Sequence, residues 1–184
     1  MINTKKDLIF YLNEDAKANG RNTIKPKFMG DVIWKYIVCL RKTEYFANTK
    51  KLIPYYIYKL KLHNYTIKFG FQIPLNVCDY GLSLPHLGTI VISSGAKIGK
   101  YCRIHEGVTI GATNGSSEAA NIGDRVFIAS GAKIIGSVCI PDDCAIGANA
   151  VVAKSIDETG STYGGVPAKK ISDNSSHANL FYYG

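Results

Sequence analysis

An aliphatic residue recurs every six positions through the second half of this chain. An amphipathic helix repeats its apolar positions every three or four residues and a half-buried strand every two, so neither explains a period of six. Six residues suffice for one short strand and one corner, and three such sides make a coil in which each aliphatic side chain stacks on its equivalent in the next coil. The pattern predicts a mainly β fold, a parallel β-helix of hexapeptide repeats. The repeat runs through Ile92, Ile98, Ile104, Ile110, Ile122, Ile128, Ile134, Ile140, Ile146 and Val152.

A second, smaller residue follows most of these aliphatic residues four positions later, where a corner leaves little space. Cys102 and Cys144 occupy such positions, so we interpret them as small core residues and not as reactive thiols. The chain has five cysteines, an odd number, and no Cys-x-x-Cys pair. This spacing supports neither a zinc site nor a disulfide framework. We therefore expect no bound metal.

The repeat divides the chain into three parts. Residues 1–74 lack the six-residue phase and predict a small α-helical N-terminal domain. Residues 75–165 form the β-helix, which residues 111–121 interrupt with a loop, because Ser116 stands where an aliphatic residue is due. Residues 166–184 form a C-terminal tail that leaves the coil. The expected helices lie around Lys5–Asn19, Phe28–Arg41 and Thr49–Leu62.

The net charge of +8 indicates an anionic partner, and many of the lysines, among them Lys59, Lys61 and Lys68, lie before position 71. We interpret them as a solvated helix surface and expect no nucleic-acid partner. A peripheral contact with anionic membrane lipid, or with a polyanionic glycan, is the alternative. No apolar run reaches membrane-spanning length, and residues 1–10 lack the apolar stretch of a signal peptide. A cytoplasmic protein is therefore expected.

Four motifs in the repeat region are distinctive: GLSLPHLGTIVI (Gly81–Ile92), CRIHEGVTIGA (Cys102–Ala112), IGANAVVAKSI (Ile146–Ile156) and GGVPAKKI (Gly164–Ile171). Together they resemble the hexapeptide-repeat acyltransferases, specifically the serine acetyltransferase branch and its relatives that O-acetylate surface polysaccharides. The resemblance covers about half of the chain. It implies a left-handed β-helix, a hand that the periodicity cannot show, since ordinary parallel crossovers are right-handed. It also implies acetyl-CoA as co-substrate and a homotrimer with active sites between subunits.

The resemblance makes His86 the catalytic base. Acetyl transfer from a thioester to an alcohol requires the hydroxyl proton to be removed as the oxygen attacks, and a neutral imidazole can accept it at pH 7. His105 is expected about one coil later and receives a secondary role. The position before His86, an aspartate in serine acetyltransferases, is Pro85 here. The carboxylate that orients His86 must therefore come from elsewhere, and Asp79 and Glu106 are the candidates.

The same resemblance predicts an acetyl-CoA site along a groove between neighbouring subunits. Small residues matter there because the pantetheine arm approaches the backbone closely, and lysines are expected to bind the phosphates. The residues predicted to bind acetyl-CoA are Gly111, Ser130, Ala148, Ala153, Lys154 and Lys169.

The identity of the acceptor depends on a second difference from the family pattern. Serine acetyltransferases carry an Arg-His pair just before the position of Ile122, which engages the amino-acid substrate, whereas this chain has Glu118, Ala119, Ala120 and Asn121. Loss of a charge-assisted contact to the serine carboxylate, typically about 1.5–3 kcal/mol, favours a sugar of a surface polysaccharide (capsule or O-antigen) as acceptor. Serine O-acetylation in cysteine synthesis is the alternative, and a non-catalytic trimeric scaffold is the third hypothesis.

Overall fold

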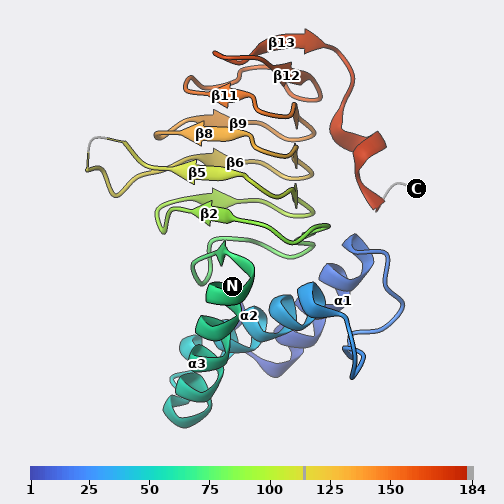
Figure 1. Ribbon diagram of the computed structural model, residues 1–184, viewed down its shortest axis with the longest axis vertical. Helices are drawn as coiled ribbons and strands as arrows, with labels where there is room; N and C mark the ends of the chain where they lie inside the picture. Colours follow the sequence, from blue (N-terminus) through green and yellow to red (C-terminus); the bar gives the residue numbers. More distant parts are fainter. Residues whose placement is uncertain (114, 182–184) are drawn as a thin grey trace.

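The computed structural model describes residues 1–113 and 115–181. Three helices gather at one end of the long axis, and a stack of β-strands extends from them to the opposite end (Figure 1). The helices are α1 (Lys5–Ala18), α2 (Val32–Asn48) and α3 (Leu52–Phe69). Within the described part of the chain, no helix combines the length and the apolar character needed to cross a membrane.

The first helix begins where the sequence predicts, and the other two begin and end later. Thr4 and Asp7 form a capping box at the start of α1, each side chain accepting a hydrogen bond from the backbone N–H of the other residue. Asp31 has a left-handed backbone with φ of 53°, so α2 begins only after it. Gly70, with φ of 76°, ends α3, in a conformation that glycine adopts without steric cost.

The strands form three sheets, and the chain visits the three in turn. The sheet orders are β1-β2-β5-β8-β11, β13-β12-β10-β7-β4 and β3-β6-β9. All adjacent strands are parallel except β12 and β13, which confirms the parallel sheets that the repeat predicts. The strands are β1 (Phe71–Gln72), β2 (Ile90–Ile92), β3 (Lys97–Ile98), β4 (Arg103–Ile104), β5 (Thr109–Gly111), β6 (Asn121–Ile122), β7 (Phe127–Ile128), β8 (Lys133–Ile135), β9 (Cys139–Ile140), β10 (Ala145–Ile146), β11 (Val151–Val152), β12 (Thr162–Gly164) and β13 (Lys169–Ser172).

The aliphatic residues of the repeat stack in the interior of the coil. Ile92 pairs with Ile110, Ile110 with Ile134, and Ile134 with Val152, and all four side chains are buried. The step between Ile110 and Ile134 is six residues longer than the other two. The strands on either side keep their phase, since β5 ends at Gly111 and β6 begins at Asn121, and both residues still pair with neighbouring strands. The loop at 111–121 that the broken repeat predicts remains a prediction.

A buried ion network joins the helices to the coil. The guanidinium of Arg41 in α2 donates to both carboxylate oxygens of Asp15 in α1, at 2.7 and 3.2 Å, and to Glu44 at 3.1 Å. It also donates to the backbone carbonyls of Cys78 and Asp79 at the start of the coil. In addition, β1 already pairs with β2 although it precedes residue 75. The hydrogen bonds of Arg41 and the pairing of β1 with β2 both cross the predicted domain boundary after residue 74. The division of the chain at that residue therefore stays a prediction.

The C-terminal segment packs back onto the coil. Strand β13 turns antiparallel onto β12 and closes the end of the stack. The 3₁₀ helix η1 (Ser176–Asn179) then runs back beside the coil (Figure 1), where His177 Nε2 lies 2.7 Å from a carboxylate oxygen of Asp143. The ring of Phe181 lies 4.4 Å from the guanidinium of Arg103. The tail thus leaves the coil only briefly and then covers one of its faces.

Candidate active site

His86 lies at the junction between the helices and the first coil. The segment before it joins the stack through a bridge between Ser83 and Arg103, and His86 itself is exposed. A cavity of about 410 Å³ opens beside it, and Arg103 and Phe181 line the same cavity. The remaining lining comes mainly from the end of α1, the start of α2 and the segment between them: Asn19, Arg21, Asp31, Val32, Ile33, Trp34 and Ile37.

His105, in the next coil, faces His86. The two ring centroids are 5.3 Å apart and the rings are nearly perpendicular, at 76°. Arg103 Nε donates to His105 Nε2 at 3.3 Å, and His105 Nδ1 lies 3.5 Å from Ser130 Oγ. Burial, with a smaller contribution from the positive charge of Arg103, lowers the pKa of His105. His105 is therefore a fixed, neutral imidazole at pH 7, held next to the exposed one.

Glu106 is the carboxylate that accompanies this histidine pair. One atom each from His86, His105 and Glu106 can be chosen so that all three lie within 4.8 Å of one another. The hydrogen bond from Ser130 is the largest of the effects that lower the pKa of Glu106, so the group is ionised at pH 7. Its Oε2 atom is buried without a hydrogen-bond partner among the described residues. A Cβ on Gly88 would lie 2.7 Å from the Cβ of Glu106, so only glycine leaves room for this carboxylate.

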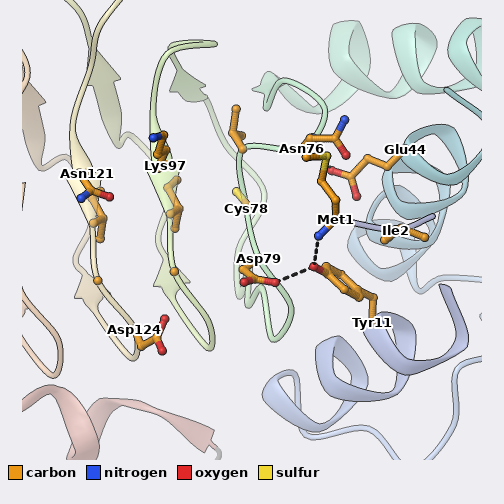
Figure 2. A pocket seen from close by; sticks show the side chains of 15 residues that line it. Met1, Ile2, Tyr11, Glu44, Asn76, Cys78, Asp79, Lys97, Asn121 and Asp124 are labelled. Carbon is orange, nitrogen blue, oxygen red and sulfur yellow. Dashed lines mark hydrogen bonds between the residues drawn. The ribbon is translucent and has the colours of Figure 1, made fainter. Parts of the chain in front are cut away.

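Asp79 lies elsewhere. Its carboxylate accepts a hydrogen bond from Tyr11 Oη at 2.7 Å, and the Met1 amine donates to the same Tyr11 oxygen at 2.9 Å (Figure 2). Asp79 belongs to a separate cavity between the N-terminus and the β3-β6 face. The reason is geometric, since Cys78 bridges to Ile98 in the wall of β3, whereas Ser83 bridges to Arg103 in the wall of β4. Of the two predicted carboxylates, only Glu106 approaches His86.

The same three side chains are the set of described residues that could hold a metal ion. Two Zn–N bonds of about 2.0 Å span at most about 4 Å. A separation of up to 4.8 Å must therefore contract before a single ion could bind all three. The geometry fits hydrogen-bonded acid–base groups better than a preformed metal centre.

The residues predicted to bind acetyl-CoA lie on the two corners that border the sheet β1-β2-β5-β8-β11. On one corner, Gly131 N donates to Glu106 O and Asn149 N donates to Ser130 O. Ser130 and Ala148 therefore lie on the corners stacked above Glu106, in the coils that follow the histidine pair. Gly111 is the last residue of β5, and Ala153 and Lys154 follow β11, so these three lie toward the other corner. Lys169 is exposed at the start of β13, next to Ala168, whose N–H donates to Val151 O.

Arg103 and Phe181 are the site residues that the sequence interpretation underrated. Arg103 stands two residues before His105 in a repeat that brings alternate residues to one face, a spacing that could have shown that it shares the wall. Phe181 carries no such signal, because it reaches the cavity only through the return of the tail.

Comparison with known proteins identifies the family. No known family profile matches the chain. The serine acetyltransferase of Staphylococcus xylosus is 35% identical over 191 residues, covering 96% of this chain and 83% of the relative. The enzyme of Helicobacter pylori strain J99 is 41% identical over 93 residues, covering 50% of this chain and 54% of the relative. This chain therefore spans about half the length of the Helicobacter relatives.

Solved structures agree on the fold. The crystal structure of Neisseria gonorrhoeae serine acetyltransferase has a TM-score of 0.72 at 25% identity, covering 92% of this chain and 68% of that chain. A serine acetyltransferase in complex with CoA has a TM-score of 0.70 at 22% identity, covering 91% and 71%. The resemblance that the motifs indicate is thus confirmed.

The expectation of a polysaccharide acceptor is wrong. The relatives and structural neighbours are serine acetyltransferases, one of which aligns with nearly the whole chain. The expectation depended on the missing Arg-His pair before Ile122, with Arg103 or Arg125 as the cation that would have to replace it if serine is the acceptor. Arg103 lines the cavity beside His86. The chain belongs to the serine acetyltransferase family.

Proposed function

We propose that this protein transfers the acetyl group of acetyl-CoA to the hydroxyl of L-serine. The observation that carries the proposal is the cluster of His86, His105 and Arg103, two of which, His86 and Arg103, line one cavity. It lies in a chain that aligns over 96% of its length with a serine acetyltransferase. Neighbouring structures are serine acetyltransferases in complex with CoA and in complex with serine, which supports both substrates.

In the proposed mechanism His86 accepts the serine hydroxyl proton as the oxygen attacks the thioester carbonyl. The C–O bond forms, the C–S bond then breaks, and the proton on His86 passes to the departing thiolate. Glu106 lies close enough to stabilise the transient imidazolium electrostatically. Backbone amides stabilise the oxyanion. Arg103 is the proposed partner of the serine carboxylate, a charge-assisted contact that neutral ligands cannot reproduce.

The proposal extends to the assembly. A left-handed coil, a homotrimer and active sites shared between subunits follow the family resemblance. The exposure of His86 supports a site that a second subunit completes. Acetyl-CoA would follow the corner that carries Ser130 and Ala148, and Gly111, Ala153, Lys154 and Lys169 would line the groove beside it. The molar mass measured by light scattering tests the trimer.

The test of the function is serine-dependent thiol release from acetyl-CoA by wild type and the His86→Ala variant. Removal of a general base typically costs 10²–10⁴-fold in rate, so kcat should fall by at least about 100-fold. His63→Ala is the matched control, because His63 is an exposed histidine of α3, remote from the cavity lining. An His86→Ala enzyme that keeps more than about a tenth of wild-type turnover would exclude His86 as the base.

A further inference from the structure

Helix α3 has two apolar faces, and only one of them is covered. Leu62 is its one buried residue, and it points toward the rest of the protein. On the opposite side lies an exposed stripe with the spacing of a helix face, in which Ile53 is 79% and Ile67 71% exposed. The residues of this α3 stripe are Ile53, Tyr56, Ile57, Leu60 and Ile67.

A basic groove runs beside the α3 stripe. It has a volume of about 440 Å³ and lies between α2, α3 and the segment before α2. Phe28 stands at this groove with 96% of its surface exposed, and Met29 follows it at 81%. None of the described residues that line the groove is acidic, and four of them are lysines: Lys27, Lys35, Lys42 and Lys61.

The charges show what kind of partner fits this end of the molecule. From Lys50 to Gly70 the chain carries five lysines and no acidic residue. Among the described residues, none of these five and none of the groove lysines forms a salt bridge. Several rest on aromatic rings instead, as Lys59 does on Tyr55. A second copy of α3 would bring lysines against lysines with no carboxylate between them, which is unfavourable.

We propose that this end of the molecule docks on the surface of an anionic phospholipid bilayer. The α3 stripe and Phe28 would lie among the acyl chains near the interface, and the groove lysines would contact lipid phosphates. Exposed apolar side chains next to lysines suit an anionic interface, because the apolar groups enter the acyl region and the cations meet the phosphates. The helices lie at the end of the long axis away from β13 (Figure 1), so docking there leaves the far coils in solution. The inference is independent of the acetyl acceptor.

The experiment is vesicle flotation of the full chain. One set of vesicles contains equal parts of phosphatidylglycerol and phosphatidylcholine, and the other contains phosphatidylcholine alone. Wild type should float with the first set and not with the second, and added salt should weaken binding because surface charge is screened. Each lysine near an anionic surface contributes about 1 kcal/mol, which is about fivefold in partition coefficient. Lys27→Ala with Lys61→Ala should therefore weaken binding by about 25-fold.

Ile57→Glu with Leu60→Glu tests the α3 stripe and should abolish flotation. The matched control is Ile9→Glu, an exposed isoleucine of α1 outside the stripe, which should float as wild type does. Unchanged melting temperature and thiol release in solution show that each variant is folded. Failure of wild type to float, or equal flotation of the stripe variant, overturns the proposal. If wild type does not float and the stripe variant has a lower molar mass than wild type in the absence of vesicles, the α3 stripe binds a second copy of the chain instead.

Discussion

Replacing Arg41 by alanine should destabilise the protein by about 3–5 kcal/mol, the usual cost of removing one partner from a buried ion pair. The guanidinium and the carboxylates of Asp15 and Glu44 are at most 2% exposed. Loss of the cation leaves two buried carboxylates without a counter-ion, and the carbonyls of Cys78 and Asp79 lose their donor. For a chain of this size that corresponds to a fall in Tm of about 6–20 °C.

The same variant should respond abnormally to pH. Without the guanidinium, burial raises the pKa of Asp15 and Glu44 above their unfolded values. A raised folded-state pKa means that the folded state binds more protons than the unfolded one, so stability falls as pH rises. The free energy of unfolding of Arg41→Ala should therefore decrease between about pH 5 and pH 8 more steeply than that of wild type.

Urea denaturation followed by circular dichroism measures both effects. The matched control is Arg125→Ala, because Arg125 pairs with Asp143 at 2.6 Å but both side chains are partly exposed; the loss should be below about 1 kcal/mol. A loss below about 1 kcal/mol for Arg41→Ala, or the same pH dependence as wild type, would refute the reasoning.

Three further predictions concern the coil and the site. Ile128→Ala removes a fully buried side chain and should cost about 2–5 kcal/mol in urea denaturation; a cost under 1 kcal/mol would mean that the stack collapses around the gap. Gly88→Ala places a Cβ 2.7 Å from that of Glu106, at φ of 143°, and should lower kcat/KM for serine at least about tenfold if Glu106 supports the base; unchanged kinetics would exclude that role. His105 should titrate below the ordinary value of about 6.5 in NMR, so its protonation should cost stability as pH falls; a pKa above 6.5 would contradict the packing described here.

Much of the coil could be predicted because its stabilising contacts repeat. Each interior residue stacks on its equivalent, so a period in the sequence becomes a period in space, as for Ile92 and Ile110. The first coil is less regular. Cys78 pairs with Ile98 and Ser83 with Arg103, so the sequence separation of each pair is two residues longer than that between Asn121 and its partner Cys139 in a later coil. That difference is why the wall that Asp79 occupies could not be read from the period.

The site was only partly predictable, because several of its parts come from outside the repeat. His86 and His105 lie in motifs, and their proximity follows from the coil spacing. Phe181 reaches the cavity by the return of the tail, and Arg21 and Trp34 come from the helical part. No periodicity connects these residues with His86. The acceptor was mispredicted because the missing Arg-His pair was given more weight than a cation on a neighbouring coil, such as Arg103, which lines the cavity.

The most direct test of the central claim is the product that the wild-type chain makes from acetyl-CoA and L-serine. Purified protein should release free thiol in proportion to serine, and mass spectrometry should find O-acetylserine in an equal amount. With kcat/KM in the usual enzyme range, about 10⁴ M⁻¹s⁻¹ or above, serine is the acceptor. Thiol release no faster with serine than without any acceptor, in a folded protein that binds CoA, would contradict the proposed function.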